Sequence, residues 1–267
     1  MVNTVRVLEW LDEMNFKAGG HAFRFYNFFS PERPAQIHPV GVPVYNIAKP
    51  RWRLDAYVTL LEKLRPKQIV ELGVFQGGSA VLLDVLCQPD KLVTIEYKPD
   101  PVAPLEEYIE TNSRDSAVKT FYGTDQSDRE KVIGIIDEEF GVTPIDFVID
   151  DASHMLYETR ESFSMIFPRM RSGGVYVIED WTWAHQNITN TAAPEGMHPD
   201  KSPLSILAIE LLMIVASTEG IIADVRFDKN SMFVKRGEAP WSSDYLDLSG
   251  LYHARAGRML NAASSGG

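Results

Sequence analysis

The sequence is short of cysteine, of positive charge and of long apolar runs, and each shortage excludes a class of protein. Cys87 is the only cysteine in 267 residues, so a disulfide-stapled fold is excluded, and its apolar neighbours indicate a buried, inert thiol. The 26 Lys and Arg face 37 Asp and Glu, and the net charge of −11 opposes binding to nucleic acid or to an anionic membrane. No apolar run reaches the roughly 20 residues of a membrane span. The first ten residues lack the pattern of a signal peptide, so we expect a cytoplasmic protein without nucleic-acid or membrane partners.

What the sequence does contain, from residue 54 onward, is an alternation of helical and extended patterns. Apolar spacing predicts helices at residues 54–64, 79–86, 102–111, 128–139, 157–170 and 203–217. Short apolar runs predict strands at 68–72, 92–96, 118–122, 145–149, 175–178, 221–227 and 232–235. The alternation predicts an α/β fold with a Rossmann-like, doubly wound and mostly parallel sheet of seven strands, closed by an antiparallel C-terminal hairpin strand.

Three other regions surround or interrupt this predicted domain, which we place at residues 54–240. Residues 1–53 are predicted to form a helical and irregular extension, with helical spacing at 5–14, that packs on the core; a lid over a ligand is the alternative. Residues 183–202 have no periodicity and are long for a connection, so we expect a substrate loop there. Residues 241–267 form a C-terminal tail. The apolar residues of the extension predict self-association into a homo-oligomer.

The loop after the first strand of the domain is rich in glycine. In parallel sheets ligands bind beyond the carboxyl ends of the strands, so this position carries weight. The segment from Glu71 to Ser79 reads ELGVFQGGS, and its glycines permit a tight turn. Phe75 stands where a dinucleotide-binding loop has its second glycine, so the loop favours a ligand without phosphates. A turn that serves only packing is the alternative.

Polar side chains also follow the second and third strands. Glu96, at the end of the second strand, is placed to accept hydrogen bonds from the hydroxyls of a ribose. Asp125 and Gln126 follow the third strand and suit the edge of an adenine. Asp125 could instead cap the next helix, because a carboxylate accepts hydrogen bonds from the first free N–H groups.

Two pairs of acidic residues end the fourth and fifth strands. They are Asp150 and Asp151, then Glu179 and Asp180. Carboxylates gathered at one edge of a sheet repel one another unless a cation lies between them, and oxygen ligands favour Mg²⁺ or Mn²⁺ over zinc. His154 follows the first pair and is a candidate general base, because histidine ordinarily titrates near neutral pH. The alternative is that the acids cap the following helices or lie on a solvated rim.

The order and spacing of three motifs resemble the class I S-adenosylmethionine-dependent methyltransferases. The motifs are ELGVxxGGS at residues 71–79, DDxSH at 150–154 and VIED at 177–180. Within that family the chain is most similar to metal-dependent sugar O-methyltransferases, such as those acting on macrolide deoxysugars and mycobacterial polysaccharides and those of the cephalosporin pathway. The resemblance covers about residues 49–235.

The resemblance implies specific roles for the motif residues. Asp151, Glu179 and Asp180 match the magnesium ligands, and His154 matches the base. The residues implied to bind the cofactor are Glu71, Gly73, Gln76, Gly78, Ser79, Glu96, Asp125, Gln126 and Asp150. Asp150 could also support the metal site by orienting the ligands without binding the metal itself.

The expected function is therefore a magnesium-dependent transfer of a methyl group from S-adenosylmethionine to a hydroxyl of a saccharide or glycosylated metabolite. A catechol-type small molecule is the alternative acceptor. In another class, an NAD-dependent oxidoreductase has a similar sheet, but Phe75 counts against it. A metal-assisted hydrolase would leave the glycine loop and Glu96 without a role. A binding protein that keeps the fold without catalysis is the remaining alternative.

Overall fold

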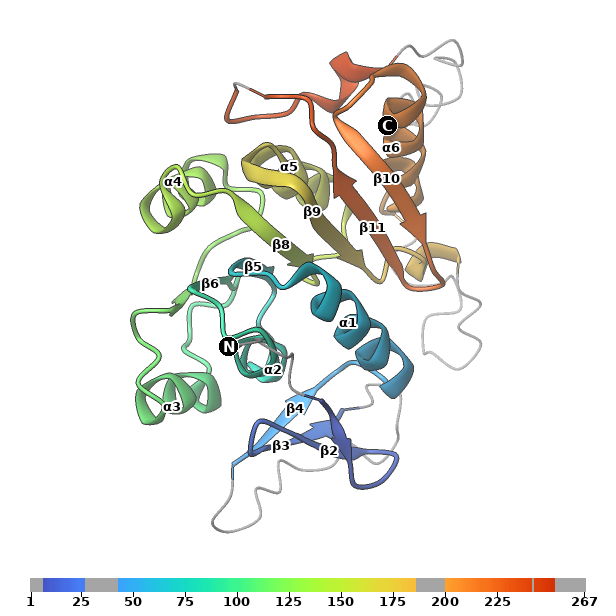
Figure 1. Ribbon diagram of the computed structural model, residues 1–267. Coiled ribbons are helices and arrows are strands. Elements are labelled where there is room, and N and C mark those ends of the chain that lie inside the picture. The colour runs from blue at the N-terminus through green and yellow to red at the C-terminus, as the bar shows by residue number, and fades with distance from the viewer. Residues whose placement is uncertain (1–6, 27–42, 186–199, 242, 253–267) are drawn as a thin grey trace. The chain divides into compact units, whose positions relative to one another are not determined.

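The computed structural model describes residues 7–26, 43–185, 200–241 and 243–252 (Figure 1). The chain forms two compact units, Met1–Asp125 and Gln126–Gly267. No helix of the described ranges is both long and apolar enough to traverse a lipid bilayer.

The first unit contains three parallel strands connected by helices. Strand β5 (Gln68–Leu72) pairs with β6 (Lys91–Ile95), and β6 pairs with β7 (Val118–Phe121). The helices are α1 (Arg51–Leu64), α2 (Gly78–Cys87) and α3 (Ala103–Thr111). The last four residues of β5 and of β6 are buried, as expected for strands covered on both faces. Cys87 is buried at the end of α2, and desolvation raises the pKa of its thiol to about 12, as the prediction of an inert thiol requires.

A small four-stranded sheet occupies the part of the N-terminal extension that the structure describes. Its strands, in spatial order, are β1 (Glu9–Trp10), β2 (Asn15–Ala18), β3 (His21–Phe25) and β4 (Val44–Ile47). Gly19 and Gly20, both at positive φ, make the two-residue turn between β2 and β3. The predicted helix at residues 5–14 is therefore wrong over 7–14. The strands instead follow an alternation of buried and exposed side chains. The buried Phe16 of β2 and Phe23 of β3 stack at 5.1 Å across the hairpin. Residues 27–42 of the predicted extension lie outside the described residues.

The second unit holds the other four strands of the main sheet. Strand β8 (Ile145–Asp150) is parallel to β9 (Met170–Glu179), while β11 (Ser231–Arg236) pairs antiparallel with both β9 and β10 (Ile222–Phe227). The helices α4 (Arg129–Phe140) and α5 (Leu156–Ile166) pack together, and α6 (Ser205–Ser217) packs on β10 (Figure 1). Strand β9 begins earlier than residue 175, where the sequence predicted it. The register of β9 against β8 shifts between Ile145 and Phe147, and this irregularity accommodates the two glycines of β9 within the strand.

The strand order of the main sheet is β10-β11-β9-β8-β5-β6-β7. The pairs that include β11 are antiparallel, and the pairs β8–β9, β5–β6 and β6–β7 are parallel. The predicted fold class, a Rossmann-like and mostly parallel sheet of seven strands with an antiparallel C-terminal hairpin, is confirmed. The predicted domain boundaries at residues 53 and 240 stay predictions.

Candidate functional site

The glycine loop of the first unit is fastened by Glu96. Oε2 of Glu96 accepts hydrogen bonds from the backbone N–H groups of Val74 (2.8 Å) and Phe75 (3.1 Å), and Oε1 accepts one from Lys98 N–H (2.9 Å). The loop needs this support because Gly73 and Phe75 both lie at positive φ, which is costly for a bulky side chain such as Phe75. Glu96 was predicted to contact a ribose. Its carboxylate retains lone pairs for such a contact, and it also sets the shape of the loop that a cofactor would meet.

The start of α2 lies directly against strand β4. A Cβ atom on Gly78 would stand 2.0 Å from the backbone oxygen of Asn46, so only glycine fits there. The Asn46 side chain donates a hydrogen bond to Oε1 of Gln76 at 2.9 Å. Gln76 and Gly78, both predicted to bind the cofactor, thus have a packing role toward the N-terminal sheet. The packing that the sequence left as an alternative is thus present in this half of the loop, and the predicted contact of both residues with the cofactor stays a prediction.

The Gly78→Ala substitution is expected to lower the free energy of unfolding by about 1–3 kcal/mol, because the new methyl group must displace the β4 backbone. Denaturant unfolding of the purified variant measures this change. Gly134→Ala is the matched control. Gly134 is exposed within α4 with no atom near its Cβ position, so alanine there should stabilise the protein by about 0.5–1 kcal/mol. Equal effects of the two substitutions would contradict the packing role of Gly78.

The remaining cofactor-binding predictions of the first unit are Glu71, Ser79 and Asp125. Glu71 is fully buried in β5, and Ser79 is partly buried in the first turn of α2. Asp125 is partly buried after β7. The alternative that Asp125 caps the next helix is wrong. Asp128 is the cap of α4, and its side chain accepts a hydrogen bond from Lys131 N–H at 3.2 Å.

Asp150 lies in a buried hydrogen-bond network in the second unit. Its carboxylate accepts hydrogen bonds from Ser162 Oγ (2.7 Å), Tyr176 Oη (3.1 Å) and Gln126 Nε2 (3.1 Å). Desolvation raises the pKa of Asp150 to about 6, against the opposing effect of these donors. Asp150 is 2% exposed and Gln126 is 5% exposed. Their polar groups therefore also support the site from within the protein, and their predicted contact with the cofactor stays a prediction.

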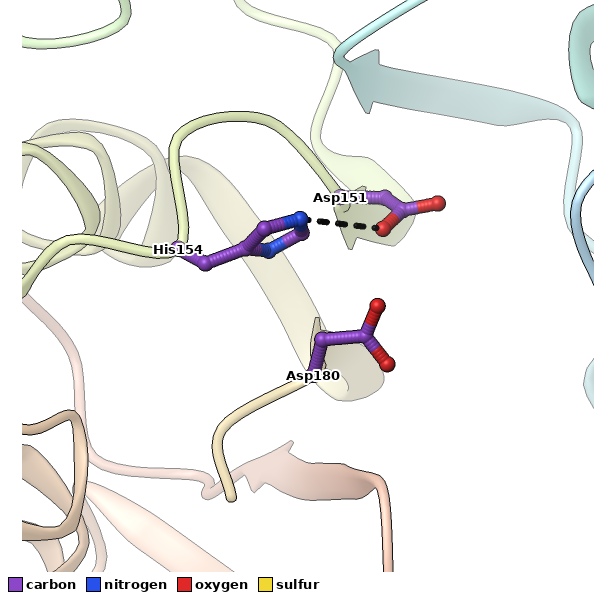
Figure 2. Close-up of side chains that lie close together, drawn as sticks. All are labelled: Asp151, His154 and Asp180. Atoms are coloured by element: carbon purple, nitrogen blue, oxygen red, sulfur yellow. Dashed lines mark ion pairs between the residues drawn. The ribbon is translucent and has the colours of Figure 1, made fainter. Parts of the chain in front are cut away.

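Three predicted residues lie together beyond the ends of β8 and β9. Asp151, His154 and Asp180 each offer one ligand atom, and these atoms lie within 4.8 Å of one another. His154 Nε2 is 3.9 Å from Asp151 Oδ1. Figure 2 shows the imidazole of His154 directed toward the two carboxylates. A cation about 2.1 Å from each ligand sets ligand atoms about 3–4 Å apart, so small side-chain adjustments would close this group around an ion.

Two of the three predicted metal ligands, Asp151 and Asp180, belong to this group. Glu179, the third, is fully buried at the end of β9, opposite Ser231 of β11, and is not among the three. The alternative that these acids cap helices is wrong for Asp151, because α5 begins after Met155 and has no side-chain cap. His154 and Asp180 both lie at positive φ, at 58° and 52°. Such backbone strain in non-glycine residues is concentrated at functional sites.

One feature of the site could not be found from local sequence patterns. Trp183 is buried in the short 3-10 helix Trp183–His185, and its indole N–H donates a hydrogen bond to the backbone oxygen of His154 at 2.8 Å. The sequence placed Trp183 at the start of a substrate loop. Residues 186–199 of that loop are outside the described residues.

Curated proteins similar to the chain are sugar O-methyltransferases. The mycinamicin VI 2''-O-methyltransferase of Micromonospora griseorubida is 47% identical over 66 residues, which cover 24% of this chain and 16% of that protein. The L-olivosyl-oleandolide 3-O-methyltransferase of Streptomyces antibioticus is 32% identical over 117 residues, 43% of this chain and 25% of that protein. The matches therefore span a quarter or less of these relatives. No protein-family model matches the chain.

A solved structure supports the likeness at the level of the fold. The MycE methyltransferase of the mycinamycin biosynthetic pathway, in complex with Mg and SAH, matches with a TM-score of 0.52 and 24% identity, over 70% of this chain and 50% of that one. The chain has the methyltransferase fold. The resemblance to sugar O-methyltransferases that the three motifs predicted is thus confirmed.

Proposed function

We propose that the chain is an S-adenosylmethionine-dependent O-methyltransferase that acts on a hydroxyl group of a saccharide or glycosylated metabolite and requires a divalent cation. The observation that carries the proposal is the group formed by Asp151, His154 and Asp180. The same arrangement on an unrelated fold would suit several reactions. On a methyltransferase fold, in a chain similar to sugar O-methyltransferases, it suits activation of a hydroxyl for methyl transfer.

Asp151 and Asp180 are the proposed holders of the cation, and Mg²⁺ or Mn²⁺ fits their oxygen donors. When bound, such a cation supplies Lewis-acid polarisation that lowers the pKa of a hydroxyl. Glu179 remains a predicted third ligand. It directly precedes Asp180, and its side chain is buried.

His154 is the proposed general base. Its imidazole lies beside both carboxylates, so a hydroxyl held there would be within reach of a ring nitrogen that can take its proton. S-adenosylmethionine supplies the electrophilic methyl group, and the protein's remaining contribution is to align the two reactants. The glycine loop is held in shape by Glu96. The proposed cofactor contacts are Glu71, Gly73, Gln76, Gly78, Ser79, Glu96, Asp125, Gln126 and Asp150.

Methyl transfer from labelled S-adenosylmethionine tests this proposal directly. Saccharides with vicinal hydroxyls, glycosylated macrolides and catechols are offered as acceptors, each with and without Mg²⁺. We expect transfer to a sugar hydroxyl that depends on the cation. Transfer to catechols alone would overturn the saccharide assignment. Binding of NAD without binding of S-adenosylhomocysteine would overturn the methyltransferase assignment itself.

A further inference from the structure

The backbone around His154 is hydrogen-bonded from two sides. Gln126 Oε1 accepts a hydrogen bond from Ser153 N–H at 2.9 Å, on the N-terminal side of His154. Trp183 Nε1 donates to the oxygen of His154 itself at 2.8 Å. Both partners are distant in the sequence, the first before β8 and the second after β9. Two separate segments therefore hold the two-residue stretch Ser153–His154.

This stretch needs support because His154 has a left-handed backbone conformation, with φ at 58°. For a residue with a Cβ atom that conformation costs about 1–2 kcal/mol relative to the right-handed one. A backbone in a sparsely populated region persists only where its surroundings determine it strongly. The two hydrogen bonds restrain rotation about the backbone of His154, on which the direction of its imidazole depends.

Both partners are themselves buried, and Gln126 is also hydrogen-bonded on both sides of its amide. Gln126 and Trp183 are 5% and 6% exposed. The amide of Gln126 has one possible orientation, because its Nε2 faces the carboxylate of Asp150, which only accepts, and so its Oε1 faces Ser153. Ser162 completes that arrangement, with its Oγ 3.1 Å from the same nitrogen. The buried network around Asp150 thus fixes one end of the support.

We propose that Gln126 and Trp183 are positioning residues that hold His154 in its left-handed conformation and so direct its imidazole toward Asp151 and Asp180. The value of this positioning for catalysis rests on the proposed function. The conformational effect itself does not, and it can be measured without cofactor or substrate.

The test compares Trp183→Phe with Trp181→Phe. The first removes the N–H group that bonds His154 and keeps an aromatic ring in place. The second is the matched control, since the Trp181 indole donates to the backbone oxygen of Asp228 at 3.1 Å. Protein labelled with ¹³C-histidine reports the backbone of residue 154 through its Cα signal, which is assigned by its loss in His154→Asn. We expect Trp183→Phe to shift or broaden this signal and Trp181→Phe to leave it unchanged.

Gln126→Met provides a second variant, which removes the amide without a large change of volume, and it decides the matter if Trp183→Phe does not fold. It should perturb the same signal. In the turnover assay we expect kcat to fall about 10- to 100-fold for either variant, because misplacing a catalytic group by about 1 Å costs that much. For Trp183→Phe, KM for S-adenosylmethionine should be unchanged.

An unaltered His154 signal in the folded variants would overturn the proposal, whatever happens to turnover. If instead the signal moves but no methyl transfer can be detected even in the unmodified protein, the positioning role stands and the proposed function fails.

Discussion

The His154→Asn substitution is expected to lower the rate of methyl transfer by about 100- to 10,000-fold, the usual contribution of a positioned general base. Asparagine is the appropriate replacement because the residue has φ at 58°, a conformation that asparagine tolerates better than alanine does. An alanine variant would combine the loss of the imidazole with added backbone strain. The rate is measured with labelled S-adenosylmethionine at saturating acceptor.

Three further measurements on His154→Asn separate a base from a metal ligand. The affinity for S-adenosylhomocysteine and the melting temperature should match those of the unmodified protein, which would show that the loss is chemical. The affinity for Mn²⁺ should also be kept. If it falls as far as in Asp180→Asn, His154 is a metal ligand, which its place in the group of three also permits. Unchanged turnover would exclude both roles.

Removal of divalent cations with EDTA is expected to reduce methyl transfer to the background rate, and added Mg²⁺ or Mn²⁺ should restore it. Without a cation held by the carboxylates of Asp151 and Asp180, the site has no Lewis acid to polarise a hydroxyl. Activity that persists after complete chelation would contradict the metal assignment.

The Asp180→Asn substitution tests the same metal site by removing a proposed ligand instead of the cation. Loss of a residue that only supports a metal ligand lowers metal affinity by roughly 10- to 100-fold. Because Asp180 is a proposed ligand itself, the Mn²⁺ affinity of Asp180→Asn, measured by titration calorimetry, should fall by more than that. Asp224→Asn is the matched control, because Asp224 is exposed on β10 and pairs in register with Lys235. Its metal affinity and turnover should not change. Glu179→Gln then shows whether the buried neighbour of Asp180 is a third ligand.

Much of the fold could be predicted because it depends on local periodicity. Strand β5 was predicted at residues 68–72 and lies at Gln68–Leu72, and β6 and β7 each end within a residue of their predicted ends. Parallel strands buried on both faces appear as short apolar runs, which are easy to recognise. The N-terminal sheet could not be predicted in this way. Its strands are short, and it depends on pairing and on aromatic contacts between residues such as Phe23 and Tyr45, far apart along the chain.

The candidate site, like the fold, could be predicted from the sequence only in part. The types and order of residues after each strand were enough to single out Asp151, His154 and Asp180, because the chain direction of a parallel sheet places such residues at one edge. The roles of Glu96, Gln126 and Gly78 were not available from their positions alone. Each is decided by a contact with a backbone group 21 to 32 residues away, at Phe75, Ser153 and Asn46.

By itself, then, the sequence determined the fold class, the acidic strand ends and the kind of chemistry that they suit, because periodicity and residue type are local properties. Only the tertiary structure decided which polar groups remain available for a ligand and which are used to hold the protein together. That distinction depends on the partner that each buried donor or acceptor finds, since leaving one unpaired costs about 1–3 kcal/mol. The Trp183 indole found its partner at His154, and no local pattern in the chain specifies that pair.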